Sequence, residues 1–218
     1  MFVSAGTNGW LLNDPGSYRV RALLRLPSED LDSNTLRLAI RPGTAAERRL
    51  EGDFFTPEVG RVLAFDGSRV LDGANATLKR VAEGLAGNPV AIHARVALAC
   101  PLATESKRLT FDDAGAKVIV YPPDESAIQR LRDALFVDAN RALETLGHID
   151  YKMYADFVTS CIEHWADRDQ SGSSRNRDEA RQCQQQLYAA MSARRVHNRR
   201  IKPSVLDSIK KRVELSST

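Results

Sequence analysis

The residues best suited to bind a metal ion are Cys161 and His164, whose C-x-x-H spacing places both side chains on one side of a helix. Cys183 or His197 could in principle complete a zinc site with them. Cys161, however, falls in an apolar stripe, where a reduced cysteine packs as a small hydrophobic residue. Because no second paired motif of Cys or His occurs, the sequence favours packing for Cys161, and we expect no metal and no other cofactor.

A nucleophilic enzyme needs a Ser or Cys brought together with a histidine and an orienting acid. The chain has no G-x-S-x-G segment, and His93, His148 and His197 are isolated in the sequence. The glycine pairs of 6–9 and 84–87 lack the strand, lysine and helix of a phosphate-binding loop. We therefore assign no catalytic residue, and a hydrolase without a recognisable motif ranks third among the functions considered.

The most suggestive polar feature is a basic run that contains Arg194, Arg195, Arg199, Arg200 and Lys202. Long basic side chains neutralise phosphates, and such binding weakens steeply as the salt concentration rises. Tyr188 is the only aromatic residue after residue 170, which argues against stacking on single-stranded bases. The alternative is that the run faces solvent, or docks on an acidic surface of the same or another chain.

Charge is distributed unevenly along the chain. Residues 171–218 hold eleven Lys and Arg against four Asp and Glu, a net charge of +7, which leaves −4 for residues 1–170 in a chain of net charge +3. The 43% hydrophobic and 27% charged residues are typical of a globular protein with one ordinary or two small domains. There is no apolar run of membrane-spanning length, no leader-like N-terminus and no disulfide framework, so we expect a cytoplasmic protein.

The clearest helical pattern lies between residues 124 and 170, the segment that includes Cys161 and His164. Apolar residues recur there at three- and four-residue steps, which predicts two amphipathic helices. The first begins at Asp124 or Ser126 and ends at Gly147, and Asp150 caps the second. The short join predicts that the two helices are antiparallel neighbours.

A second helix pair is predicted before this segment. Asn75 would cap a helix over 76–86. Residues 90–100 alternate as a strand would, but the start at Asn88-Pro89 and the four alanines predict a helix instead. The two helices would form the supersecondary unit of helical repeats.

Two further segments share a pattern that an internal repeat would explain. Residues 61–67 and 107–113 both run from a basic residue through Leu and Phe-Asp to a turn that precedes a helix. Two segments with so few identical residues are more often similar by chance than through duplication. Residues 45–50 fit a short helical turn, and residues 62–71 fit a small hairpin or a loop.

The first forty residues favour extended chain. Apolar and polar residues alternate over 18–26 and again over 35–40, with Pro27-Ser28 between them, so two strands joined by a polar loop are expected. A lone hairpin is at best marginally stable in water. This hairpin therefore needs a covering layer or further strands.

Residues 16–22, Gly-Ser-Tyr-Arg-Val-Arg-Ala, followed by 33–38, Ser-Asn-Thr-Leu-Arg-Leu, resemble the closing two strands of immunoglobulin-like β-domains in large modular bacterial proteins. A tetratricopeptide-like helical segment can follow such a domain, and residues 75–102 are similar to one. The resemblance covers residues 16–102 and implies no catalytic residue. Since the earlier strands of such a domain are absent, either the hairpin packs on the helices or its open edge awaits a partner strand.

The C-terminal part, from residue 167 onwards, is predicted to contribute less to a hydrophobic core than the preceding helices. Residues 167–177 fit a polar linker, residues 178–198 a helix with a thin apolar stripe that could reach Val196, and Pro203 precedes a short last helix.

The predicted fold is therefore α+β and mostly α, with a β-hairpin region (1–43), a helical module of antiparallel helix pairs (44–170) and a basic helical tail (171–218). The function predicted first is a non-catalytic protein-interaction or scaffold module that uses the hairpin edge, a helix groove or the tail as its contact surface. A nucleic-acid-associated protein that binds phosphates through its tail is the alternative.

Overall fold

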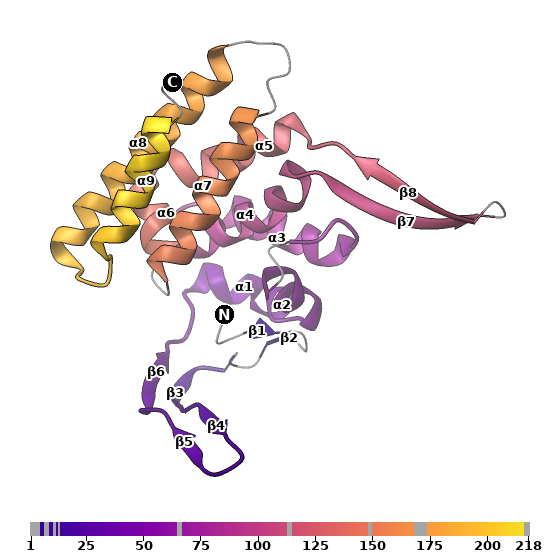
Figure 1. Cartoon of the computed structure of the whole chain (residues 1–218). Helices are drawn as coiled ribbons and strands as arrows, with labels where there is room; N and C mark the ends of the chain where they lie inside the picture. Colours follow the sequence, from indigo (N-terminus) through magenta and orange to yellow (C-terminus); the bar gives the residue numbers. More distant parts are fainter. Residues whose placement is uncertain are drawn as a thin grey trace.

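The computed structural model describes residues 5–6, 9–10, 12, 14–64, 67–112, 115–147, 150–167 and 174–215. The fold is α+β and mostly α with small antiparallel sheets, as predicted (Figure 1). The strands are β1 (Ala5–Gly6), β2 (Gly9–Trp10), β3 (Gly16–Val20), β4 (Leu23–Arg25), β5 (Asp30–Asp32), β6 (Leu36–Ile40), β7 (Ser106–Asp112) and β8 (Gly115–Tyr121). The helices are α1 (Ala45–Phe54), α2 (Pro57–Ala64), α3 (Asp72–Gly84), α4 (Pro89–Ala103), α5 (Glu125–Phe136), α6 (Ala139–Leu146), α7 (Tyr151–Asp167), α8 (Ser174–His197) and α9 (Pro203–Leu215).

The helices enclose two hydrophobic clusters that share α4. The smaller cluster, around Leu78 and Val81, is formed by α2, α3 and one side of α4. The larger cluster joins the other side of α4 to α5, α6, α7, α8 and α9, with Leu131, Val158 and Met191 at its centre. Because α4 is apolar on nearly all sides, it packs against both groups of helices.

The strand-like alternation over 90–100 does not decide the structure of this segment, since it forms α4. Asn88 caps the helix by accepting a hydrogen bond from the backbone N–H of Val90 at 3.0 Å, and Pro89 occupies the first turn. The buried alanines Ala91, Ala94 and Ala97 leave room for α3 and α5 to approach closely. The predicted helix pair of α3 and α4 is present.

The single helix predicted over 124–147 is wrong, because the structure has two. The Asp138 carboxylate accepts a hydrogen bond from the backbone N–H of Arg141 at 3.0 Å and starts α6 where α5 has ended. Asp124 does cap α5, through the N–H groups of Ser126 and Ala127. Asp150 caps α7 as predicted, but α7 packs mainly on α8 and only slightly on α6.

Predictions for the preceding region are also partly wrong. Of residues 62–71, expected to form a small hairpin or a loop, residues 62–64 belong to helix α2, residues 67–71 form a loop, and residues 65–66 lie outside the described residues. Asn75 lies inside α3, where its side-chain amide donates to the backbone carbonyl of Ser68 at 2.9 Å, and the helix begins at Asp72. The proposed repeat has no structural counterpart, since residues 61–64 are helical and residues 107–111 lie in a strand.

The C-terminal helices belong to the larger core, contrary to the prediction of a weakly committed tail. Leu187, Met191 and Ile201 are almost completely buried there. Helix α8 already begins at Ser174, inside the predicted linker, whose residues 168–173 lie outside the described residues. Val196 is 78% exposed, because the last turn of α8 extends past the core.

Two β-hairpins leave the helical body in different directions (Figure 1). The predicted N-terminal hairpin is present, but as four short strands: β3 pairs with β6 and β4 with β5, and β5 lies in the segment predicted to be a loop. The second hairpin pairs β7 with β8 along their full length and was not predicted. Its strands lie within the segment expected to be a helical module.

Candidate interaction surfaces

The second hairpin has one more apolar face and one mixed face. Residues directly opposite each other in an antiparallel ladder share a face. The more apolar face is built from Leu109 opposite Val118, Phe111 opposite Ala116, and Val120, which lies opposite Lys107. The other face is mixed, with Arg108 opposite Ile119, Thr110 opposite Lys117 and Ser106 opposite Tyr121. The hairpin is therefore amphipathic, like a strand pair that packs on a core.

This apolar face is not covered within the described part of the chain. The exposed fractions are 55% for Leu109, 76% for Phe111, 55% for Val118 and 49% for Val120. The root of the hairpin is held at the end of α4, since the N–H of Asp124, after β8, donates to the Leu102 carbonyl at 2.9 Å. The Arg69 side chain also fixes this end of α4 by donating to the backbone carbonyls of Pro101 at 2.7 Å and Thr104 at 3.1 Å. A fixed root with an open apolar face makes this hairpin a candidate contact surface.

The first hairpin also has an apolar face, and a β-bulge keeps that face continuous. Two residues separate β3 from β4, but three separate β5 from β6. Ser33 fills the bulge, where its hydroxyl accepts from the N–H of Ala22 and its own N–H donates to the Ala22 carbonyl, both at 2.9 Å. The extra residue lets Leu31 and Leu36 occupy one face despite their odd spacing.

The face formed in this way contains Tyr18 opposite Leu38, Val20 opposite Leu36, and Leu24 opposite Leu31. The three leucines Leu24, Leu31 and Leu36 are about half exposed. The predicted covering layer or further strands are absent among the described residues of this sheet. Of the two sequence-based alternatives, the structure therefore matches the open hairpin rather than one packed on the helices.

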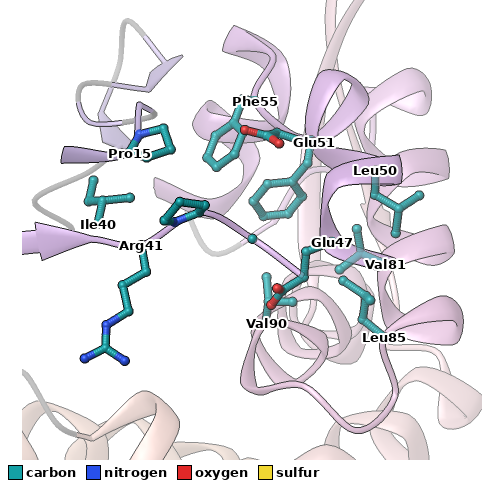
Figure 2. A pocket seen from close by; sticks show the side chains of 13 residues that line it. Pro15, Ile40, Arg41, Glu47, Leu50, Glu51, Phe55, Val81, Leu85 and Val90 are labelled. Atoms are coloured by element: carbon teal, nitrogen blue, oxygen red, sulfur yellow. The ribbon is translucent and has the colours of Figure 1, made fainter. Parts of the chain in front are cut away.

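A pocket of about 330 Å³ lies at the root of the first hairpin, between its last residues and the helices α1, α3 and α4 (Figure 2). Its lining is mostly apolar, with the carboxylates of Glu47 and Glu51 among it. Glu47 is already used structurally, because it accepts hydrogen bonds from the backbone N–H of Thr44 and from the Asn88 side chain. These hydrogen bonds, the one from Thr44 first, hold the pKa of Glu47 below its usual value.

A second hollow, of about 700 Å³, is the helix groove that the sequence prediction allowed for. It runs between α3, α4 and α5, and its apolar lining includes Leu98, Leu102 and Ala134. Charged side chains of both signs, among them Lys79 and Asp133, surround it. Such a lining suits a protein segment better than a single charged small molecule.

The predicted phosphate-binding residues are brought to one corner but differ in their contacts. Arg194 forms an ion pair with Glu144 on α6 at 2.7 Å, which fits the alternative of docking on the acidic body. Arg195, Arg199, Arg200 and Lys202 are exposed near the turn between α8 and α9. The remaining four side chains are therefore available to a partner.

The predicted metal ligands do not converge on a site. No group of three His, Cys, Asp or Glu side chains is arranged to hold a metal ion in the described part of the chain. Burial, with a smaller effect of Cys100, raises the pKa of Cys161 to about 12, which opposes the thiolate that zinc requires. Burial also raises the pKa of Cys183, and His197 is exposed at the end of α8.

Among the described residues, no helix combines the length and apolar character needed to cross a bilayer. Comparison of the chain with protein-family models, with curated proteins and with solved structures finds no match. The immunoglobulin-like and tetratricopeptide-like resemblance of residues 16–102 stays a prediction.

Proposed function

We propose that this chain is a non-catalytic protein-interaction or scaffold module whose contact elements are its two β-hairpins. The observation that carries the proposal is the open apolar face of β7 and β8. Two-stranded hairpins are marginally stable in water, so an apolar face on one is best explained by a partner that covers it.

The apolar face can supply part of the energy of a complex. Completing the burial of its four large apolar side chains, which are half to three-quarters exposed, contributes on the order of 4 kcal/mol, about the amount that association itself costs, so a stable complex needs further contacts beyond this face. The first hairpin offers a second face of similar character. Two such contacts in one chain suit a molecule that holds two partners.

The helical body supports the same role. The antiparallel pair of α3 and α4 is similar to the unit of helical-repeat scaffolds, and we propose that the body acts as a rigid support of this kind. Cys161 and Cys183 are buried, reduced thiols, which supports a reducing, cytoplasmic location. A hydrolase has no supporting observation among the described residues.

The test replaces apolar side chains of this face with threonine, which keeps residues that favour a β-strand. The double variant Leu109→Thr and Val118→Thr removes two side chains of that face, and Arg108→Thr with Lys117→Thr is the matched control on the opposite face. We expect the first variant to lose its stoichiometric partner in affinity purification, or its self-association in light scattering. If wild type and both variants are equally monomeric and co-purify the same proteins, the proposal is wrong.

Nucleic-acid binding through the basic corner is the second candidate, and the four exposed basic side chains near the α8–α9 turn favour it. The variant Arg199→Glu with Arg200→Glu should reduce the affinity for duplex DNA or RNA by at least about tenfold at low salt and flatten its salt dependence. Electrophoretic mobility shifts at two salt concentrations measure this. If the variant and the wild type bind the nucleic acid with equal affinity, this corner is not a nucleic-acid-binding site.

A further inference from the structure

The polar face of the first hairpin holds two arginines with no acidic partner. Arg19 lies directly opposite Arg37 in the β3–β6 ladder, so both guanidinium groups project from the same face. Both side chains are exposed, and neither forms an ion pair with a carboxylate in the described part of the chain. Like charges placed directly opposite each other destabilise a strand pair, so this arrangement has a cost that a bound anion would remove.

The arginines closer to the tip differ from this pair. Arg21 forms an ion pair with Asp32 at 3.1 Å, and Arg25 lies opposite Asp30 in the ladder. Toward the root, Arg41 follows Ala39 by two residues, so alternation places it on the side of Arg37, and Figure 2 shows its side chain extending away from the apolar pocket. The uncompensated charge is therefore confined to the root half of the hairpin.

The chemistry of this patch fits planar oxyanions. Guanidinium groups bind carboxylates and phosphates through two parallel hydrogen bonds. The small size of the patch decides between them. Asp32 pairs with Arg21 and Asp30 lies opposite Arg25, so the unpaired positive charge does not continue along the hairpin as a long nucleic-acid backbone would require. The reverse face is apolar, with Val20 and Leu36 opposite each other, which suits a protein and not a phosphate backbone.

We propose that the Arg19–Arg37 face is the docking site for an acidic segment of a partner protein, whose carboxylates pair with these guanidinium groups. An extended segment in which acidic and apolar residues alternate fits best, because it can add to the strand edge with acids on the arginine face and apolar side chains on the opposite face. This inference rests on the proposed scaffold function and names the chemistry of one partner.

The experiment measures the fluorescence anisotropy of a short labelled peptide of alternating Glu and Val against the full chain, with an alternating Lys and Val peptide for comparison. Wild type should bind the acidic peptide at least about tenfold more tightly than the basic one. The double variant Arg19→Glu and Arg37→Glu should reverse this preference, and Arg19→Gln with Arg37→Gln should abolish it. The matched control, Lys210→Glu with Lys211→Glu, changes the charge by the same amount at two exposed residues of α9 and should behave as wild type.

Three results would overturn the inference. Wild type could bind both peptides equally, the Lys210 and Lys211 control could lose as much affinity as the Arg19 and Arg37 variant, or duplex DNA could depend on Arg19 and Arg37 when the acidic peptide does not. Thermal unfolding of each variant checks that it folds. Because the Leu109 and Val118 variant tests the other hairpin, a negative peptide result combined with partner loss in that variant would retain the scaffold function and reject only this site.

Discussion

Burial determines the chemistry of Cys161, and it does so against the metal-binding hypothesis. Burial raises its pKa from 9.0 to about 12. At pH 8 about one thiol in ten thousand is then ionised in the folded protein, compared with about one in ten in the unfolded chain. We expect Cys161 to resist a thiol reagent at pH 8 until denaturant is added, which labelling followed by peptide mass spectrometry measures. Rapid native labelling at Cys161 would contradict this.

The same shift affects stability at alkaline pH. A thiol whose folded pKa is raised stays neutral while the unfolded chain ionises, so the free energy of unfolding falls as the pH rises above about 9. Cys161→Ala should show a smaller decrease between pH 8 and pH 10 than wild type in denaturant titrations. Parallel decreases in the two proteins would assign the effect to other groups.

The ion pair between Arg132 and Glu179 should stabilise the fold more than a surface pair does. Their nitrogen and oxygen atoms are 2.6 Å apart, and the side chains are 23% and 29% exposed. Burial alone lowers the pKa of Arg132, but the hydrogen bond and charge of Glu179 outweigh it and raise the pKa. Arg132→Met should lower the free energy of unfolding by about 2 kcal/mol, because a mostly buried, charge-assisted hydrogen bond to Glu179 is lost.

The control for this variant is Lys152→Met. Lys152 pairs with Asp156 on the same helix, and both side chains are more than half exposed. Its loss should cost less than about 0.5 kcal/mol in the same denaturant titration. Equal costs for the two variants would show that the Arg132 pair behaves as a surface pair.

Alanine substitutions at two glycines with nearly the same φ angle should affect stability differently, one across the whole protein and the other only within a hairpin. Gly67 and Gly115 have φ angles of 117° and 114°. A Cβ at Gly67 would lie 2.3 Å from the Ala97 carbonyl oxygen, whereas at Gly115 it would meet nothing within 4 Å. Gly67→Ala should therefore lower the global stability by about 3 kcal/mol or more, since backbone and core must both move.

Gly115→Ala should cost about 1–2 kcal/mol, and only within the second hairpin. Hydrogen exchange should speed up in β7 and β8 while the thermal midpoint of the helices is unchanged. A lower midpoint for the whole protein would mean that the hairpin contributes to the core.

Sequence patterns predicted those elements whose signals are local. Asn88-Pro89 and the alanines after it identify α4, and Asp124 identifies the start of α5. The break at Asp138 could not be found from periodicity, because the apolar stripe continues across it. The second hairpin had a usable signal in the alternation around Leu109 and Val118, but its basic residues suggested the approach to a helix.

The whole molecule depends on its C-terminal helices. Because α8 and α9 cover the apolar faces of α5 to α7, a chain that ends at residue 170 would expose that core. We expect this truncated chain to lose cooperative unfolding and sharp near-ultraviolet circular dichroism while it keeps much of its helix signal. A cooperative transition close to that of the full chain would show that residues 1–170 fold independently.

The many basic residues of α8 and α9 led to the prediction of a tail, although both helices are part of the hydrophobic core. Charge patterning predicts that arginines reach the surface, and they do, but it does not identify the acids they contact. Arg194 meets Glu144, and Arg212 meets Glu163 at 3.4 Å, both on elements distant in sequence. The narrow apolar stripe of α8 was visible, yet its burial depends on α6 and α7, which only the fold brings to it. The exposed basic residues near the turn between α8 and α9 could be predicted from the sequence. The two open apolar faces of the hairpins could not, because they depend on which residues pair across the strands.

Helix α4 connects the roots of the two hairpins. At its first turn, Asn88 binds Glu47 of α1, beside the pocket below the first hairpin, and two residues after its last turn the second hairpin begins. The fifteen residues of α4 span about 22 Å. If each hairpin holds a partner, the length of α4 sets the distance between the two bound proteins. An insertion of a single helical turn would change both this distance and the relative rotation of the two proteins.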